Sequence, residues 1–460
     1  MLQESANGSE CDFTNHGSQS NNQLRCNFAQ SKQLQAISHQ LIPGGCHTYA
    51  KGDDQFPALA PGFITRGQGT HVWDLDGNEY IEYGIGCRAV SLGHAYPSVV
   101  QAAQQTMQYG VNFSRPAPIE VECAKQLLGM IDGAEMVKFC KDGSAATTAA
   151  FKLARAHTRR DKIAFCGDHP FFSTSDWFIG STKINAGIPQ AINDLSLTFR
   201  YNDIDSVRKM FQDNSGQIAG LIMEPAKYSD PEDNFLHKVQ DVCHENGAVF
   251  ILDEMITGFR WHNGGAQKYY DIVPDLSTFG KAMANGFAVS ALVGKKELME
   301  LGGLHHDQER VFLLSTTHGA ETHSLAAAIE TMKVYQQEPV IETVYRQGER
   351  LRDGIQAVIK SHELTGFVEV LGKPCCLVLV SRDQNKEPSQ AFRTLMLQET
   401  IKRGVLMLSL VTSYTHSEDD IDFTIQAIDE ALHVYKKALA HGVEKFLVGP
   451  PSKPVYRRFN

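Results

Sequence analysis

Two short runs of the sequence decide the fold: AVFILDE at residues 248–254 and LSTFGK at residues 276–281. Both runs have the length and apolar composition of buried strands. The first run reaches the acidic residue Asp253, and the second ends in Lys281, 28 positions later. Because ligands of open α/β sheets bind outside the carboxyl ends of the strands, we expect these two charged side chains to face one site.

The sequence around these runs alternates between strand-like and helix-like segments. Further apolar runs of strand length lie at residues 136–139, 162–165 and 219–223. Segments with helical periodicity lie at residues 99–108, 120–130 and 145–156. This alternation predicts an α/β fold in which a large, mostly parallel sheet is covered by helices on both faces. We assign this large domain to residues 97–337.

The rest of the chain is predicted to form a smaller α+β domain. Residues 338–460 have the pattern of a helix, two strands, a second helix, a short strand and a long final helix. We assign the N-terminal segment 36–96, which carries the hairpin signal Asp76-Gly77, to the same domain. Residues 1–35 are rich in Ser, Asn and Gln and lack the apolar core of a signal peptide, so we expect a polar, disordered tail there.

The overall composition argues against two classes of partner. The 460 residues carry a formal net charge of −10, whereas a nucleic-acid-binding protein usually presents a basic surface. No run approaches the roughly 18 consecutive apolar residues that a membrane-spanning helix needs. The ten cysteines are scattered, without metal or redox spacing, as in reduced proteins of the cytoplasm. We therefore expect a cytoplasmic protein with no nucleic-acid or membrane partner.

A first polar cluster, Lys141-Asp142-Gly143-Ser144, follows the strand-like run at 136–139 and precedes a predicted helix. Free backbone amides, a hydroxyl group and the positive end of a helix dipole together suit a phosphate group. Taken alone, Gly143 and Ser144 are better explained as an ordinary loop and helix cap.

The other two clusters are the charged strand ends themselves. A buried carboxylate such as Asp253 is costly unless a cation meets it, and a protonated pyridine nitrogen would be such a cation. An ion pair with Arg260 or a helix cap would also explain a carboxylate at this position.

A lysine in a partly desolvated pocket has a lowered pKa and can act as a nucleophile and proton carrier, although a surface lysine at a strand end would look the same. In this order at successive strand ends, Gly143-Ser144, Asp253 and Lys281 describe one cofactor site.

With these residues, the chain from Pro43 onward resembles the class III aminotransferases, which use pyridoxal 5'-phosphate (PLP) and have the fold type I of aspartate aminotransferase. Within that family it is most similar to the glutamate-1-semialdehyde 2,1-aminomutase branch. The resemblance is carried by the following runs: PGG at 43–45, LGHAYP at 92–97, LDEMITGFR at 252–260, GGAQ at 264–267 and FGK at 279–281.

The resemblance implies roles for individual residues. Lys281 would carry PLP as a Schiff base, Asp253 would bind the pyridine nitrogen, and Gly143 and Ser144 would hold the phosphate. Thr317 corresponds to the threonine that the family contributes to the phosphate of the neighbouring subunit, so a homodimer with shared active sites is expected. For the ring that stacks on the cofactor, His169 is the candidate and Phe171 the alternative.

The segments expected around the substrate depart from the aminomutase pattern. Lys51 lies where the aminomutase has an arginine shortly after the PGG run, and the glutamate-bearing loop of the aminomutase has no counterpart in residues 404–414. Arg88 and Arg115 lie in segments expected to face the active site, where arginine suits a carboxylate or phosphate; each could equally brace a loop. We therefore favour amino transfer between two molecules, an amino donor and a small anionic aldehyde or ketone, by a ping-pong mechanism.

Two other functions are compatible with the sequence. An intramolecular aminomutase would use the same cofactor but keep both amino positions on one molecule. A catalytically silent PLP-binding protein would need neither Lys281 nor Asp253, and the presence of both argues against it.

Overall fold

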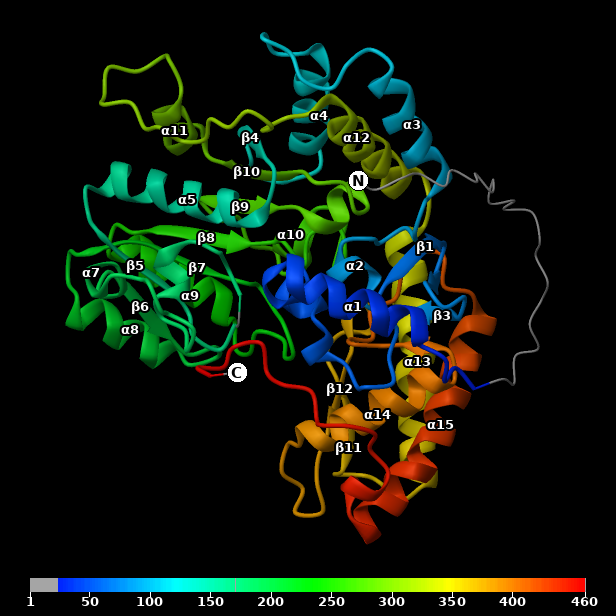
Figure 1. Ribbon diagram of the computed structural model, residues 1–460. Helices are drawn as coiled ribbons and strands as arrows, with labels where there is room; N and C mark the ends of the chain where they lie inside the picture. Colours follow the sequence, from blue (N-terminus) through cyan, green and yellow to red (C-terminus); the bar gives the residue numbers. More distant parts are fainter. Residues whose placement is uncertain (1–23, 170, 460) are drawn as a thin grey trace.

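The computed structural model describes residues 24–169 and 171–459. Its largest element is a seven-stranded sheet (Figure 1). From one edge to the other, the strands are β4 (Met136–Cys140), β10 (Ser290–Gly294), β9 (Leu276–Phe279), β8 (Val249–Asp253), β7 (Ile218–Met223), β5 (Lys162–Cys166) and β6 (Ser196–Phe199). Strand β10 is antiparallel to both of its neighbours, whereas the other strand pairs are parallel. The predicted large, mostly parallel sheet is thus confirmed.

Helices cover both faces of this sheet. In β10, Leu292 belongs to one buried hydrophobic cluster, whereas Ala291 and Val293 belong to another. Because successive side chains of a strand point to opposite faces, the two clusters lie on the two sides of the sheet. The first cluster includes α5 (Gly143–Thr158), α8 (Ile204–Asp213) and α9 (Phe235–Glu245). The second includes α3 (Pro97–Met107), α4 (Pro118–Leu128) and α12 (Thr322–Gln337), which lie side by side in Figure 1.

Shorter helices complete this part of the chain. They are α6 (Asp176–Ile179), α7 (Gln190–Asn193), α10 (Gly265–Tyr269) and α11 (Lys296–Met299). No helix in the described residues is both long and apolar enough to cross a membrane.

The smaller part of the molecule combines the two ends of the described chain. Its four-stranded sheet has the order β1 (Ile64–Gln68), β2 (His71–Asp74), β3 (Glu79–Glu82) and β13 (Val405–Leu406), so a C-terminal strand extends an N-terminal meander. A second sheet pairs β11 (Val368–Leu371) with β12 (Val378–Ser381). The helices around these sheets are α1 (Ala29–Leu41), the short turn α2 (Ile85–Arg88), α13 (Val340–Ser361), α14 (Gln390–Lys402) and α15 (Glu418–His441).

The expected polar tail, residues 1–35, extends too far into the chain. Residues 1–23 lie outside the described residues, but α1 already begins at Ala29. The carboxylate of Asp76 accepts hydrogen bonds from the backbone amides of Gln30 and Ser31 at 2.7 and 3.0 Å. The helix start is therefore satisfied by a residue 45 positions away in the chain, a contact that the local polar composition does not reveal.

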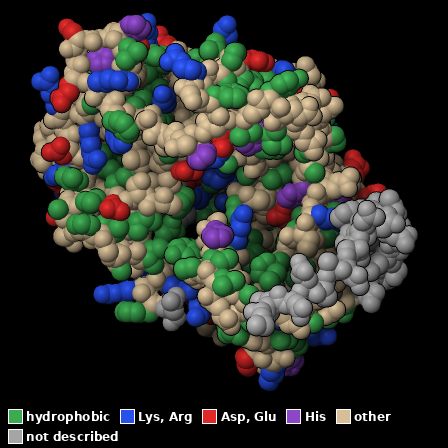
Figure 2. Space-filling model, turned by 45° about the horizontal axis from the view of Figure 1, so that its top comes forward, with side chains coloured by type: hydrophobic (Ala, Val, Ile, Leu, Met, Phe, Trp, Pro, Cys, Tyr) green, Lys and Arg blue, Asp and Glu red, His purple; other side chains and the backbone are tan. Residues whose placement is uncertain are grey.

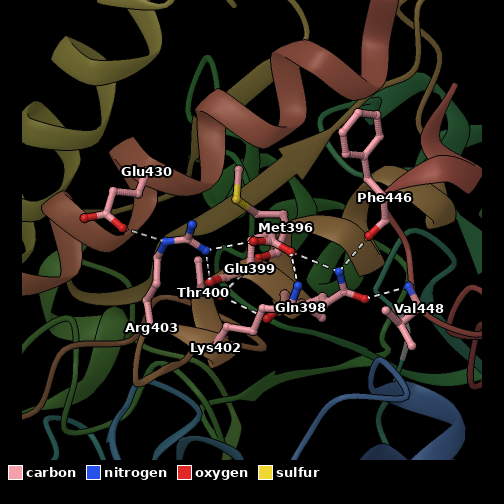
Figure 3. Close-up of polar contacts among 10 residues, drawn as sticks. Met396, Gln398, Glu399, Thr400, Lys402, Arg403, Glu430, Phe446 and Val448 are labelled. Carbon is pink, nitrogen blue, oxygen red and sulfur yellow. Dashed lines mark hydrogen bonds and ion pairs between the residues drawn. The ribbon is translucent and has the colours of Figure 1, made fainter. Parts of the chain in front are cut away.

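A buried charged cluster joins the helices of the smaller part (Figure 3). Glu399 on α14 is 4% exposed and forms ion pairs with Lys402 at 2.7 Å and Arg403 at 2.8 Å. Arg403 also pairs with Glu430 on α15 at 2.8 Å. The neighbouring Gln398 binds the backbone of the segment after α15, through the carbonyl of Phe446 and the amide of Val448. These contacts hold the C-terminal segment against α14.

Candidate active site

The ends of β8 and β9 bring Asp253 and Lys281 to the same edge of the large sheet. The two strands are parallel, and Asp253 lies opposite Thr278. The chain then passes through Gly280 and reaches Lys281, the first residue of a short 3-10 helix, Lys281–Ala284. A side chain at Gly280 would approach Ser290 Oγ at 2.5 Å and Met255 Sδ at 2.7 Å. Close packing therefore explains the glycine that precedes Lys281.

Asp253 is buried, at 3% exposure, with one carboxylate oxygen already occupied. Oδ1 accepts hydrogen bonds from the Met255 amide and the Thr278 hydroxyl, both at 3.0 Å. Within the described residues Oδ2 has no hydrogen-bond partner. Burial and the nearby Glu224 charge raise the pKa of Asp253 to about 6. The site thus holds a carboxylate that a cation at Oδ2 would stabilise.

The alternative explanation for Asp253, an ion pair with Arg260, is not found among the described residues. Arg260 Nε donates to the carbonyl of Ile256 at 3.1 Å, and Arg260 Nη2 donates to the carbonyl of Arg88 at 2.6 Å. Arg260 therefore braces the Arg88 turn.

The environment of Lys281 favours the neutral amine. Burial lowers the pKa of Lys281, and the charges of Arg88 and Lys227 lower it further, while Asp253 and Glu224 oppose the change. No group in the described part of the chain forms a hydrogen bond or ion pair with Lys281 Nζ. A neutral, unengaged amine is the form that can attack a carbonyl group.

Glu224 and Lys227 belong to the same charge cluster, and the sequence analysis missed both. Glu224 directly follows β7 and is 3% exposed, with Lys227 Nζ 2.8 Å from its Oε1. Burial raises the pKa of Glu224, but Lys227 and His169 outweigh burial and lower it. Its position just after a buried strand was the available signal, the same signal that identified Asp253.

The two candidates for a stacking ring lie in different surroundings. His169 is 4% exposed, its charge interactions are with Glu224 and Lys227, and within the described residues its Nδ1 has no hydrogen-bond partner. Burial lowers the pKa of His169 to about 4, so the ring is neutral at pH 7. Phe171 is 47% exposed and packs edge-on against Phe178. Of the two rings, His169 is therefore the one that lies within the charge cluster.

The predicted phosphate loop has the geometry of an anion site. Asp142 caps α5 by accepting a 2.9 Å hydrogen bond from the Ala145 amide. The backbone N–H groups of Gly143 and Ser144 have no acceptor among the described residues, while the Ser144 hydroxyl accepts from the Thr174 amide at 2.9 Å. A side chain at Gly143 would lie 2.9 Å from Met255 Sδ. The loop therefore offers free amides at the start of a 16-residue helix, as phosphate sites do.

Arg88 reaches the cluster from a strained turn. The residues of α2 all have positive φ angles: Ile85 at 35°, Gly86 at 59°, Cys87 at 60° and Arg88 at 68°. Left-handed backbone costs about 1–2 kcal/mol for each residue other than glycine, and such strain concentrates at functional sites. Arg88 has no carboxylate partner among the described residues, and its Nε is buried without an acceptor.

Arg115 and Thr317 lie on two loops that hydrogen bonds join to each other. Both side chains are exposed. The loops that carry them are joined by a 2.9 Å hydrogen bond from Asn112 Nδ2 to the Thr317 carbonyl and by a 3.1 Å bond from the Thr322 amide to the Val111 carbonyl. Neither side chain forms a hydrogen bond or ion pair with the residues around Lys281.

Lys51 also lies apart from this cluster. It lines a cavity of about 320 Å³ formed by α1, residues 51–62 and the C-terminal residues 450–453. A second cavity, of about 240 Å³, is lined by His169 and Lys227 together with Tyr201 and Tyr228. Figure 2 shows a hollow in one face of the molecule where acidic, basic and histidine side chains gather.

These residues fit PLP in three respects. Free amides at the start of α5 suit its phosphate group. Asp253 Oδ2 is available for the ring nitrogen. Lys281, with its lowered pKa, is available for the aldehyde.

Comparison with known proteins identifies the family. The sequence profile described as Aminotransferase class-III matches residues 48–432. The 3-aminobutyryl-CoA aminotransferase of Cloacimonas acidaminovorans is 31% identical, over 90% of this chain and 99% of that protein. The glutamate-1-semialdehyde 2,1-aminomutase of Desulforamulus reducens is 30% identical, over 89% and 99%. The FumI protein of Sphingopyxis sp. MTA144, solved in a form that carries PLP, superimposes with a TM-score of 0.82 at 28% identity, covering 89% of this chain and 97% of FumI. The chain belongs to the class III aminotransferase family and is a PLP-dependent enzyme with the fold type I architecture.

Proposed function

We propose that this enzyme transfers an amino group between two molecules, an amino donor and a small aldehyde or ketone, and that Arg88 binds an anionic group on one of them. The observation that carries the proposal is the unpaired Arg88 guanidinium, whose charge lowers the pKa of Lys281. An arginine close enough to shift the pKa of the reacting amine, with no carboxylate partner in the described part of the chain, suits a carboxylate or phosphate of the substrate.

The charge cluster supplies the remaining roles. With PLP bound, Lys281 would be the residue that attaches it, and the free Lys281 amine would carry the proton at the substrate carbon. Asp253 would bind the ring nitrogen through Oδ2, His169 would stack on the ring, and Gly143 and Ser144 would hold the phosphate. PLP supplies the electron sink that stabilises negative charge at the substrate carbon. The two half-reactions then follow one another in a ping-pong cycle.

We also propose a homodimer in which Thr317 contributes to the partner's phosphate site. In this chain Thr317 is exposed and separate from its own Lys281 cluster. Large apolar side chains are exposed on or near the joined loops: Tyr109 at 83%, Phe113 at 52% and Phe312 at 72%. Exposed apolar residues gathered in one region mark protein interfaces, and Arg115 lies in the same region.

A cytoplasmic location is supported by the cysteines. All nine cysteines in the described residues are free thiols, six of them buried. Free buried thiols are typical of proteins in a reducing compartment.

The competing function is the intramolecular aminomutase reaction, after which the 30% identical relative from Desulforamulus reducens is named. Lys51 and residues 404–414 depart from the aminomutase pattern, but Lys51 lines a cavity to which Lys281 does not contribute. The preference for transfer between two molecules therefore rests on Arg88 and on the sequence of residues 404–414.

A half-reaction experiment tests the proposal. The purified PLP form is mixed with single amino donors, and the loss of the PLP absorbance in the visible range is followed as the pyridoxamine form accumulates. We expect conversion with at least one anionic donor, followed by recovery of the PLP form when a carbonyl acceptor is added. No conversion with any donor, together with rapid formation of 5-aminolevulinate from glutamate-1-semialdehyde alone, would establish the aminomutase instead.

A further inference from the structure

A group of two histidines and one aspartate lies between α13 and α15, on elements that contribute no residue to the Lys281 cluster. His362 directly follows α13, whereas Asp429 and His433 lie on α15. His362 Nε2 is 2.7 Å from Asp429 Oδ1, and the two imidazole rings are 4.3 Å apart with an interplanar angle of 86°. One ligand atom from each of the three residues lies within 4.8 Å of the other two.

The backbone fixes two sides of this group. Asp429 and His433 are four residues apart on a helix, so their side chains project from the same face. His362 is held by the hydrogen bond from its amide to the Val358 carbonyl at 3.1 Å and is 8% exposed. Only the arrangement of the two packed helices brings His362 to this face of α15.

The ligand set and spacing suit a zinc ion. Zinc binds imidazole nitrogen at about 2.0–2.1 Å and carboxylate oxygen at about 2.0–2.2 Å, usually in a tetrahedron. In such a tetrahedron the ligand atoms lie about 3.4 Å from one another. The exposed His433 ring has no hydrogen-bond or ion-pair partner among the described residues, so it can turn toward the other two side chains. Three protein ligands and a water molecule would complete the site.

The charges around the group leave it open to a cation. Lys436, one turn along α15 from His433, is neutralised by its 2.9 Å ion pair with Glu363. Arg403 is neutralised by Glu399 and Glu430. Among the described residues, Asp429 has no cationic partner other than His362, which carries charge only when it is protonated.

We propose that His362, Asp429 and His433 form a zinc site that fastens α13 to α15. The inference is independent of the proposed amino transfer, because it concerns the stability of the smaller part of the molecule. An ion that binds the folded arrangement and not the unfolded chain raises stability by an amount that grows with the logarithm of its concentration relative to Kd. The ion therefore raises the unfolding temperature and leaves catalysis unchanged.

A zinc-binding experiment on the complete PLP-bound enzyme tests the proposal. The enzyme is prepared without a histidine tag, and a chelator first removes any bound metal. Zinc chloride is titrated in competition with a chromophoric chelator of known affinity, and bound zinc is counted after dialysis. We expect about one zinc ion per chain in the wild type and at least a tenfold loss of affinity in His433→Ala and Asp429→Asn. The Asn variant keeps an oxygen to accept the His362 hydrogen bond, so it should fold normally.

The matched control is His441→Ala, which removes another exposed histidine of α15. It should bind zinc as the wild type does. Zinc should raise the unfolding temperature of the wild type and of His441→Ala by a few degrees, and that of His433→Ala by less than about one degree. Equal zinc affinity in the wild type, His433→Ala and Asp429→Asn would overturn the proposal and indicate other ligands, such as the exposed Cys26 and Cys87. Failure of the wild type to retain zinc would overturn it as well.

Discussion

Asp253 and Thr278 lie opposite each other on β8 and β9, and the Thr278 hydroxyl donates a 3.0 Å hydrogen bond to Asp253 Oδ1. The bond orients a buried carboxylate whose second oxygen remains available. Without a cation at that oxygen, burial makes the negative charge unfavourable and the pKa rises to about 6. The apoenzyme should therefore hold Asp253 at a cost in stability that cofactor binding relieves.

The first prediction follows from this cost. Asp253→Asn should lower turnover by orders of magnitude, because a neutral amide does not favour a protonated ring nitrogen. The same change should stabilise the apoenzyme at neutral pH by on the order of 3 kcal/mol, since the folded-state pKa of about 6 exceeds the unfolded value of 3.8.

The stability difference between the wild type and Asp253→Asn should depend on pH. The Asp253 pKa is raised on folding, so the wild-type apoenzyme loses stability as the pH rises from the unfolded pKa to the folded one. The stability advantage of Asp253→Asn should therefore grow between about pH 4 and pH 6 and level off above that. Denaturant unfolding of both apoproteins at several pH values measures it. An advantage that does not change with pH would show that Asp253 is not ionised at a cost in the apoenzyme.

The second prediction concerns Lys281. Lys281→Ala should abolish turnover but still fold and bind PLP noncovalently, because the amides of Gly143 and Ser144 and the Asp253 carboxylate remain. Borohydride reduction followed by peptide mass spectrometry should locate the cofactor on Lys281 in the wild type and find no modified lysine in the variant. Lys227→Ala is the matched control, since it removes the neighbouring ammonium group. If borohydride still trapped the cofactor in Lys281→Ala but not in Lys227→Ala, Lys227 would be the attachment point.

The third prediction concerns the buried ion pairs of α14. Glu399→Ala should lower the free energy of unfolding by about 3 kcal/mol, because Lys402 and Arg403 lose a buried partner. Glu363→Ala breaks the exposed, solvent-screened pair with Lys436 and should lower the free energy of unfolding much less. Urea unfolding at pH 7 compares the two variants, and similar losses would mean that burial does not set the value of the Glu399 pairs.

The Glu399 effect should also depend on pH. Burial raises the pKa of Glu399, but the hydrogen bonds from Lys402, Gln398 and Arg403 outweigh burial and lower it. Its stabilisation is therefore present above the unfolded pKa of about 4.3 and is lost as the pH falls through the lowered folded value. The difference between wild type and Glu399→Ala should shrink on acidification below about pH 4.

The sequence predicts the central strands β7, β8 and β9 of the large sheet but not β10. Strands β7, β8 and β9 are short, mostly apolar runs with Glu224, Asp253 and Lys281 at or just past their ends, so their positions and their common edge follow from local pattern. The antiparallel strand β10 escaped prediction, although its sequence SALVG is apolar. Its place between β4 and β9 is set by pairing with residues 150 or more positions away in β4, and no local signal encodes that pairing.

The residues of the candidate active site also differ in how well the sequence predicts them. Asp253, Lys281 and Gly143-Ser144 are recognisable because each follows a strand. The strained turn that carries Arg88 is invisible in the sequence, since Ile85 and Cys87 are residues that rarely adopt positive φ angles. Lys51 follows a family landmark, yet the fold places it in a cavity with α1 and the C-terminal segment.

The fourth prediction tests the shared active site. Thr317→Val should weaken PLP retention, and mixed dimers of Thr317→Val with Lys281→Ala should regain activity. In such a dimer one site combines the intact Lys281 of one chain with the intact Thr317 of the other, while both lesions fall in the second site. Activity of verified heterodimers should therefore reach about half that of the wild type. Activity no higher than half that of the Thr317→Val homodimer would count against a site built from two chains.

The last prediction concerns specificity. Arg88→Ala should raise the KM for an anionic substrate roughly ten- to a hundredfold, because truncating a desolvated charge-assisted contact costs about 1.5–3 kcal/mol. The visible spectrum of bound PLP should not change, since the change leaves Lys281, Asp253 and the phosphate loop intact. The Arg88 carbonyl that accepts from Arg260 also remains. An unchanged KM for the anionic substrate in Arg88→Ala would remove Arg88 from the substrate site.

The wild type should also convert glutamate-1-semialdehyde to 5-aminolevulinate poorly. Efficient conversion without an external donor would mean that the unpaired guanidinium serves an intramolecular transfer, and that the departures from the aminomutase pattern at Lys51 and residues 404–414 do not change the reaction.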